Sequence, residues 1–193
     1  ERLLIGYHAP EVAHPDSYGL KVAEAVLSTG KSSRLYQRLV ERDQSVTRAD
    51  ASSHDHIDPS LFYFQAELKP GFKLADVEGA TFEEIDRLKR CDISTAEVDK
   101  AKRQIEASLV LSSEEPLQQA MLLGQYETIA FGEHVPEDSR GYHYLDTLLE
   151  RVASVTIEEI GTVARKYFTE DNRTVGYLIS DEESGSKESN RAG

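Results

Sequence analysis

The alternation of apolar and polar residues divides the chain into short strands and longer helices. Residues 2–8 form the apolar run of a buried strand, and residues 61–68, rich in aromatic side chains, predict a second strand. Between residues 16 and 27, apolar side chains recur with the spacing of one helix face. The polar, alternating residues 45–56 are expected to pair with residues 61–68 as an antiparallel hairpin.

The second half of the chain is mainly helical by the same criterion. Residues 74–89 carry the apolar stripe of a helix, and capping boxes at Ser94 and Thr156 each predict the start of another. Pro116 is tolerated only in a first turn, so residues 112–116 are expected to break or kink the helix, and a further helix is expected to run to about residue 130. A closing strand is expected at residues 174–179. This order predicts an α+β fold, an antiparallel sheet with helices packed on one face.

Length and composition are those of a globular domain. With 193 residues, of which 39% are apolar and 30% charged, the chain can build one core, which we assign to residues 1–180. Residues 181–193 have almost nothing to bury and predict a disordered acidic tail. Because the chain starts at Glu1 and enters a strand at once, we expect it to have been cut from a longer protein.

The net charge of −13 narrows the choice of partners. An acidic chain of this kind is not expected to bind nucleic acid, and it is compatible with a basic peptide. No run approaches the roughly 18 apolar residues of a membrane span, so none is expected. The compartment stays open between periplasm and cytoplasm.

Residues 30–39, Gly-Lys-Ser-Ser-Arg-Leu-Tyr-Gln-Arg-Leu, separate two predicted helices. Gly30 is expected to end the first helix in a left-handed conformation, and the hydroxyl of Ser32 or Ser33 is expected to start the second. The same letters resemble the end of a phosphate-binding loop, G-x-x-x-x-G-K-[ST]. In that loop the first glycine would fall on Ala25, and a strand would have to come first where a helix is predicted. Nucleotide binding is therefore disfavoured.

Several short motifs occur in the order and spacing of one known family. They are Pro10, His14-Pro15-Asp16, Gly30, Ser33-Arg34-Leu35, Phe62-Tyr63-Phe64 and Ala164-Arg165-Lys166-Tyr167-Phe168. Together they span nearly the whole chain, which resembles the C-terminal, non-zinc-binding domain of the pitrilysin, insulinase and mitochondrial processing peptidase family of zinc metallopeptidases. The fold of that family is similar to the one predicted above, a sheet with a helical layer.

The resemblance implies the C-terminal half of a zinc-dependent metalloendopeptidase, which encloses an extended peptide substrate. A homologous zinc-binding N-terminal domain or subunit would supply the metal and the general base, and a dimer is compatible with this arrangement. The isolated chain would not hydrolyse peptides. The alternative is a catalytically inactive structural or assembly subunit of the same family.

No metal site is expected in this chain. Zinc peptidases of the resembled family use the motif H-x-x-E-H, and none of the six histidines stands in it. His54 and His56 have ligand-like spacing on a strand, but no third ligand can be named, so we expect them to be solvated hairpin residues. The zinc cofactor and all catalytic residues are therefore expected in the partner half.

The resemblance also identifies two positions at which the chain departs from the family. An arginine and a tyrosine seven residues apart normally bind a carbonyl of the peptide near the scissile bond. Here Val40 and Thr47 take those positions, and neither side chain can do that job. Arg38, Arg42 and Arg48 are near in sequence, but the sequence places none of them at the missing site.

Four residues are candidate substrate contacts: Arg34, Tyr36, Phe62 and Phe64. A structural role is favoured for Arg34, which can pair with a carboxylate or a helix end and fix the turn at Gly30. Tyr36 is equally explained as a packed aromatic residue. Phe62 and Phe64 share one face of their strand. One face of that strand must pack on helices, and the other can line a chamber or bind an extended peptide.

Overall fold

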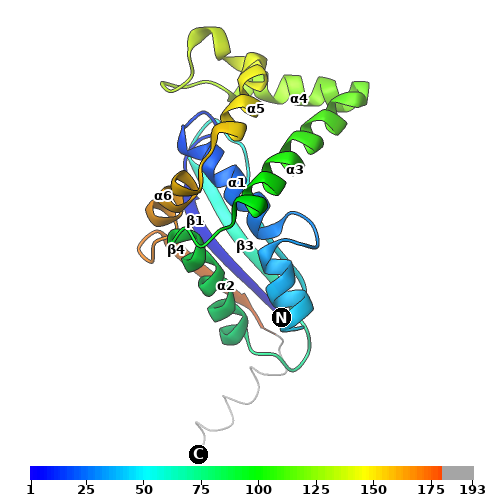
Figure 1. Ribbon diagram of the computed structural model, residues 1–193, viewed down its shortest axis with the longest axis vertical. Helices are drawn as coiled ribbons and strands as arrows, with labels where there is room; N and C mark the ends of the chain where they lie inside the picture. Colours follow the sequence, from blue (N-terminus) through cyan, green and yellow to red (C-terminus); the bar gives the residue numbers. More distant parts are fainter. Residues whose placement is uncertain (180–193) are drawn as a thin grey trace, which may run out of the picture.

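The chain forms one sheet and a layer of helices in a computed structural model that describes residues 1–179 (Figure 1). The disordered tail predicted for residues 181–193 lies outside the described residues. The domain predicted at residues 1–180 is therefore described up to residue 179.

Four strands make up the sheet, in the order β2-β3-β1-β4, and every neighbouring pair is antiparallel. The strands are β1 (Arg2–Ala9), β2 (Val46–Ser53), β3 (Ser60–Leu68) and β4 (Arg173–Leu178). In this register Leu4 of β1 lies opposite Gln65 of β3 on one side and Gly176 of β4 on the other. Strands β2 and β3 form the hairpin that the sequence predicts.

Helices cover only one face of this sheet. α1 (Asp16–Ser28), α2 (Leu74–Lys89) and α6 (Ile157–Tyr167) pack against the strands (Figure 1). Side chains of a strand alternate between its two faces, so Ile5 is buried under the helices while Leu4 is half exposed on the other side. We call this second side the open face. The predicted α+β fold with helices on one face is confirmed.

An aromatic cluster forms the centre of the core, between the sheet and α6. The ring of Phe168 lies 4.9 Å from that of Phe62 and 5.1 Å from that of Tyr7, and the Tyr7 and Phe64 rings meet edge to face at 6.0 Å. All four side chains are at most 2% exposed. Aromatic side chains bury more apolar area than any others, so this cluster dominates the stability of the domain.

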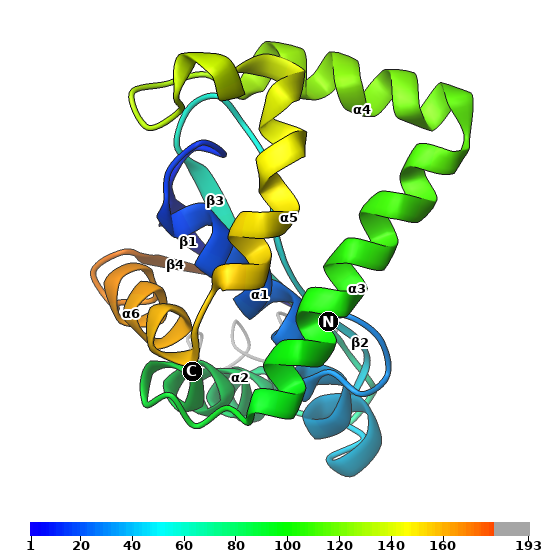
Figure 2. The ribbon, with the colours of Figure 1, turned by 45° about the horizontal axis from the view of Figure 1, so that its top comes forward.

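The remaining helices extend beyond the end of the sheet. α3 (Thr95–Glu114), α4 (Pro116–Ile129) and α5 (Tyr144–Ser154) form a projecting arm (Figure 2). α3 begins at the predicted capping box, in which the Ser94 hydroxyl accepts a hydrogen bond from the Glu97 N–H, and α4 begins at Pro116 as predicted. Shorter helical segments are η1 (Tyr36–Arg42), which is π-helical, η2 (Glu137–Ser139) and η3 (Gly141–His143). Among residues 1–179, none of the helices is long and apolar enough to cross a bilayer.

The turn after α1 differs in one respect from its prediction. Gly30 takes the expected left-handed conformation, with φ of 79°. The Ser33 hydroxyl, however, is buried without a hydrogen-bond partner among the described residues, and the Ser32 hydroxyl accepts from Lys100 instead of capping a helix. The predicted serine cap is therefore wrong. The Ser33 N–H donates to the Gly30 carbonyl at 3.1 Å, and this backbone bond closes the turn.

Candidate functional site

The open face of the sheet carries a groove of about 560 Å³ that crosses all four strands. We call it the sheet groove. Its lining includes Arg2, Leu4, Arg48, Asp50, Gln65, Glu67, Gly176, Tyr177 and Leu178. Because successive residues of a strand alternate between faces, the alternation that buries the core presents most of these side chains to a ligand. Tyr177 is the exception, since it lies opposite Leu3 and its hydroxyl donates to Glu78 of α2 at 2.8 Å, on the helical side of the sheet.

The sheet groove combines apolar and charged side chains. Leu4 and Leu178 are 50% and 62% exposed, which leaves a strip of apolar surface that no other residue within 1–179 covers. Beside it, Arg2 pairs with Glu67 at 2.8 Å, and Arg48 pairs with Asp50. Such a surface can contact both the side chains and the main-chain carbonyls of an extended peptide.

The position of the family tyrosine coincides with an irregularity of strand β2. Val46 pairs with Leu68 and Arg48 pairs with Glu67, so Thr47 is an extra residue between them. A β-bulge of this kind re-aims the neighbouring side chains. Thr47 itself is exposed, and its hydroxyl donates to the Glu67 carbonyl at 3.3 Å.

Of the three arginines near the missing pair, the structure brings one to the sheet groove. Arg48 lines it, with a side chain that is 67% exposed. Arg38 and Arg42 instead pair with Asp43 at 2.7 and 3.0 Å, next to η1. Val40, at the position of the family arginine, lies within η1 and is half-buried. Arg38 and Arg42 belong to η1, whereas the bulge turns Arg48 of β2 to the open face, and sequence spacing alone predicts neither feature.

The phenylalanines of β3 take the core face of the sheet. Phe62 is fully buried and Phe64 is 2% exposed. The residues of this strand on the open face are therefore Leu61, Tyr63, Gln65 and Glu67. The Tyr63 ring is half-buried and stacks on His54 with the ring centroids 5.4 Å apart. The alternation of β3 predicts two faces, and the helices decide which one the phenylalanines occupy.

Arg34 ties the turn after α1 to the start of α3. Its Nε donates to Glu97 at 2.7 Å and its Nη2 donates to the Asp92 carbonyl at 2.6 Å. Burial alone would raise the pKa of Glu97, but the hydrogen bonds from Arg34 and Ser94 outweigh it and lower that pKa to about 2. The geometry is that of a structural clamp between segments 63 residues apart.

Tyr36, the next candidate, lies at the start of η1 and is half-buried. A hydrogen bond with Glu41 raises the pKa of its phenol, because the carboxylate favours the protonated form. Contact of Arg34, Tyr36, Phe62 and Phe64 with a substrate stays a prediction.

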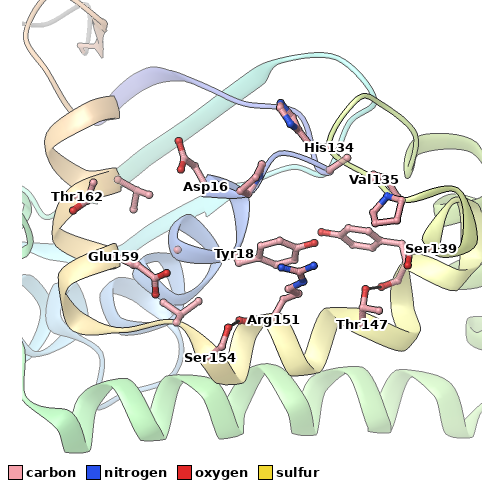
Figure 3. A pocket seen from close by; sticks show the side chains of 17 residues that line it. Asp16, Tyr18, His134, Val135, Ser139, Thr147, Arg151, Ser154, Glu159 and Thr162 are labelled. Carbon is pink, nitrogen blue, oxygen red and sulfur yellow. Dashed lines mark hydrogen bonds between the residues drawn. The ribbon is translucent and has the colours of Figure 1, made fainter.

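A second hollow, which the sequence did not indicate, lies between α1, α5, α6 and the loop before η2 (Figure 3). Its volume is about 290 Å³. Asp16 on its wall accepts hydrogen bonds from Lys166 at 2.5 Å and Tyr167 at 2.8 Å, and these outweigh burial and lower the pKa of its carboxyl. Glu159 is occupied by the capping box of α6. The lining residues come from segments far apart in the sequence, so no sequence motif predicts this hollow.

The side chains of this second hollow do not form a hydrolytic site. His134 packs its ring against that of His14, 4.9 Å away. The hydroxyls of Ser139 and Ser154 donate to Asp138 and to the Arg151 carbonyl, so neither is paired with a histidine base. Figure 3 shows Arg151 beside Tyr18 in the hollow.

The histidines do not converge on a metal site within residues 1–179. No group of three or more potential ligands of the right kind occurs in this part of the chain. The rings of His54 and His56 are 6.2 Å apart, and both side chains are exposed. The described residues thus lack the three protein ligands that a catalytic zinc ion requires.

Comparisons with known proteins agree with this fold. The family described as the peptidase M16 inactive domain matches residues 1–105, more than half of the chain. The zinc protease PqqE of Helicobacter pylori is 26% identical over 178 residues, which are 92% of this chain and 38% of that protein. The uncharacterized zinc protease YmxG of Bacillus subtilis is 28% identical over 169 residues, which are 88% of this chain and 39% of that protein.

A solved structure shows the same architecture. The crystal structure of a protease from Helicobacter pylori superposes with a TM-score of 0.79 at 24% identity, over 90% of this chain and 39% of that one. The chain thus spans about two fifths of the length of these relatives. Together with the family match and the four-stranded sheet under a helical layer, these comparisons show that the chain belongs to the family of peptidase M16 inactive domains.

Proposed function

We propose that this domain is the zinc-free half of a zinc-dependent metalloendopeptidase, and that its open face covers an extended peptide held by a homologous zinc-binding half. The observation that carries the proposal is the sheet groove, a hollow of about 560 Å³ on the one face of the sheet that has no helical cover among the described residues. The absence of a three-ligand metal cluster from residues 1–179 agrees with a division of labour in which the other half holds the metal.

In this proposal Arg48 makes the contact with a peptide carbonyl that an arginine at the position of Val40 makes in the family. Its guanidinium can donate to a carbonyl of the bound peptide, because it is exposed in the groove and its pairing with Asp50 leaves N–H groups over. Leu4 and Leu178 provide the apolar contacts beside it. The acidic balance of the chain, with a net charge of −13, favours basic peptides over acidic ones.

The length of the relatives supports the proposal of a partner domain. They are more than twice as long as this chain, which leaves room for a second domain. That domain would be the zinc-binding half, on the same polypeptide or on a separate one. An H-x-x-E-H motif in the companion segment would identify it.

A structural or assembly subunit without peptidase activity is the second candidate. The observation in its favour is the replacement of the family arginine and tyrosine by Val40 and Thr47. Under this alternative the open face would bind a partner protein permanently, and no member of the assembly would need an intact zinc motif.

Replacement of Arg48 by alanine tests whether the open face contacts substrate. In the complete peptidase, kcat/KM for an unstructured basic peptide should fall about tenfold or more, since a charge-assisted hydrogen bond is worth roughly 1.5–3 kcal/mol. The matched control is Arg103→Ala, which removes an exposed arginine of α3 that has no ion pair among the described residues. Equal activity of the Arg48→Ala variant and the wild type would contradict the assignment of the open face to substrate.

A further inference from the structure

Four arginines surround a hollow of about 330 Å³ where η1 meets the end of α2 and the start of α3. They are Arg34, Arg38, Arg42 and Arg87. We call this hollow the arginine pocket. Arg34 precedes η1, Arg38 and Arg42 belong to it, and Arg87 comes from the last turn of α2.

Carboxylates at the rim hold the arginine side chains in place. Arg38 donates through Nε to Asp43 at 2.7 Å and through Nη2 to Glu83 at 2.8 Å. Arg42 donates through Nε to the same Asp43, at 3.0 Å. Because the carboxylates already fix the arginine side chains, little further ordering is needed when a ligand binds, and the site is preorganised.

Arg87, which comes from α2, is held in the same way. Its Nε donates to Asp92 at 2.7 Å, and its Nη1 contacts Glu84 at 3.2 Å. Asp92 lies beyond the rim, whereas Glu84 lines the pocket and is 4% exposed.

These ion pairs do not use up the donors of the guanidinium groups. A guanidinium has five N–H groups in a planar fork. Among residues 1–179, Arg38 keeps Nη1, Arg87 keeps Nη2 and Arg42 keeps both Nη atoms without a hydrogen-bond partner. The unused donors belong to groups that line one hollow.

Arg34 also lines the pocket and supplies a second, independent observation. It is 8% exposed, and its Nη1 is buried without a hydrogen-bond partner among the described residues. The Glu84 carboxylate lies 3.8 Å from this atom, which is too far for a hydrogen bond. Buried polar groups in proteins are nearly always hydrogen-bonded, so this charged donor calls for an acceptor from outside the described residues, an ordered water or a ligand.

The charge of the lining selects the kind of ligand. Two carboxylates, Glu84 and Glu97, line the pocket with the four guanidinium groups, so the wall itself carries two more positive than negative charges. Asp43, Glu83 and Asp92 bind the outer edges of the arginines and Lys100 adds an ammonium, so the cluster as a whole is neutral and the positive charge is confined to the wall of the pocket. A phosphoryl group carries a charge of about −1.5 to −2 at pH 7 and three acceptor oxygens, and arginine forks match its geometry.

We propose that the arginine pocket binds a phosphoryl group, either as inorganic phosphate or as the phosphate of a small organic ester. The glycine, lysine and serine at residues 30–32 are not the carriers of this proposal, because a phosphate-binding loop would use backbone amides of a strand-to-helix turn. Here the donors are side chains from three elements. The site shares no lining residue with the sheet groove and does not depend on the proposed peptidase function.

Calorimetric titration of the full 193-residue chain with inorganic phosphate and with methyl phosphate tests the proposal. Each ligand is added at constant ionic strength against a chloride background. We expect saturable one-to-one binding, at least tenfold weaker in Arg42→Gln, whose side chain makes only one rim contact and is 60% exposed. Arg103→Gln, a charge-matched change outside the pocket, should bind like the wild type. Binding of both ligands supports an ester site, and binding of inorganic phosphate alone supports a site for the free ion.

Three results would overturn the assignment. They are the lack of saturable binding, equal weakening by Arg42→Gln and Arg103→Gln, and binding of acetate as tight as that of phosphate. Without saturable binding there is no phosphate site. Equal weakening by the two substitutions would mean that binding depends only on the net charge of the chain. Equally tight binding of acetate would mean that the pocket does not prefer a dianion. Because Arg42 is exposed, its replacement should leave the melting temperature within a few degrees of the wild type, so a loss of binding is not a loss of fold.

Discussion

Replacement of Arg34 by methionine is expected to lower the free energy of unfolding by about 3 kcal/mol. Methionine preserves much of the side-chain volume but removes the counter-charge of Glu97 and a hydrogen bond to the Asp92 carbonyl. It also leaves Glu84, whose side chain is 5% exposed, with Arg87 as its only ion-pair partner among the described residues. The Glu97 side chain is 34% exposed, so solvent screens part of its loss and we take the lower end of the range for buried pairs.

The same substitution should change how stability depends on pH. The folded pKa of Glu97, about 2, lies below its ordinary value near 4.5, so this contribution is fully present above pH 4.5 and is lost as the pH falls towards 2. Denaturant unfolding at pH 7 and at pH 3 measures it. The difference between wild type and Arg34→Met should be smaller at pH 3, and an equal difference at both values would contradict the clamp. Arg103→Met is the matched control and should be near neutral at both.

The second large effect is expected at the aromatic cluster. Phe62→Ala should cost about 3–5 kcal/mol, because it leaves a cavity between the sheet and the ring of Phe168. Tyr63→Ala, one residue later and on the open face, should cost less than about 1 kcal/mol. Thermal or urea unfolding of the two variants gives the comparison. A larger loss for Tyr63→Ala than for Phe62→Ala would reverse our assignment of the faces of β3.

The elements of the fold that are encoded locally could be predicted from the sequence. The helix at residues 74–89 has the bounds of α2, since its apolar stripe and the flanking turn residues are contiguous in sequence. The capping boxes at Ser94 and Thr156 form as expected, because each joins a side chain to a backbone amide only three residues away. Pro116 begins a helix for a similarly local reason, its missing N–H.

The features that depend on distant contacts could not be predicted. Period-two alternation placed Phe62 and Tyr63 on opposite faces of a strand, but only the packed helices decide which face is buried. The bulge at Thr47, which brings Arg48 to the sheet groove, depends on pairing with β3. Arg34 and Arg87 share a pocket because two helices and a turn meet there, and no spacing in the sequence encodes that meeting.

The central claim is that this chain is the zinc-free half of a two-part peptidase. The most direct test measures zinc content and peptide cleavage for three samples: the 193-residue chain, its zinc-binding companion, and the two together. The substrate is an unstructured basic peptide, and each sample is assayed with and without a chelator. We expect no stoichiometric zinc in the 193-residue chain alone and cleavage only by the combination, abolished by the chelator. Full cleavage by the companion alone, or one-to-one zinc in the isolated chain, would contradict the account. Zinc-free, inactive material in every sample would contradict it as well and would favour the structural subunit in its place.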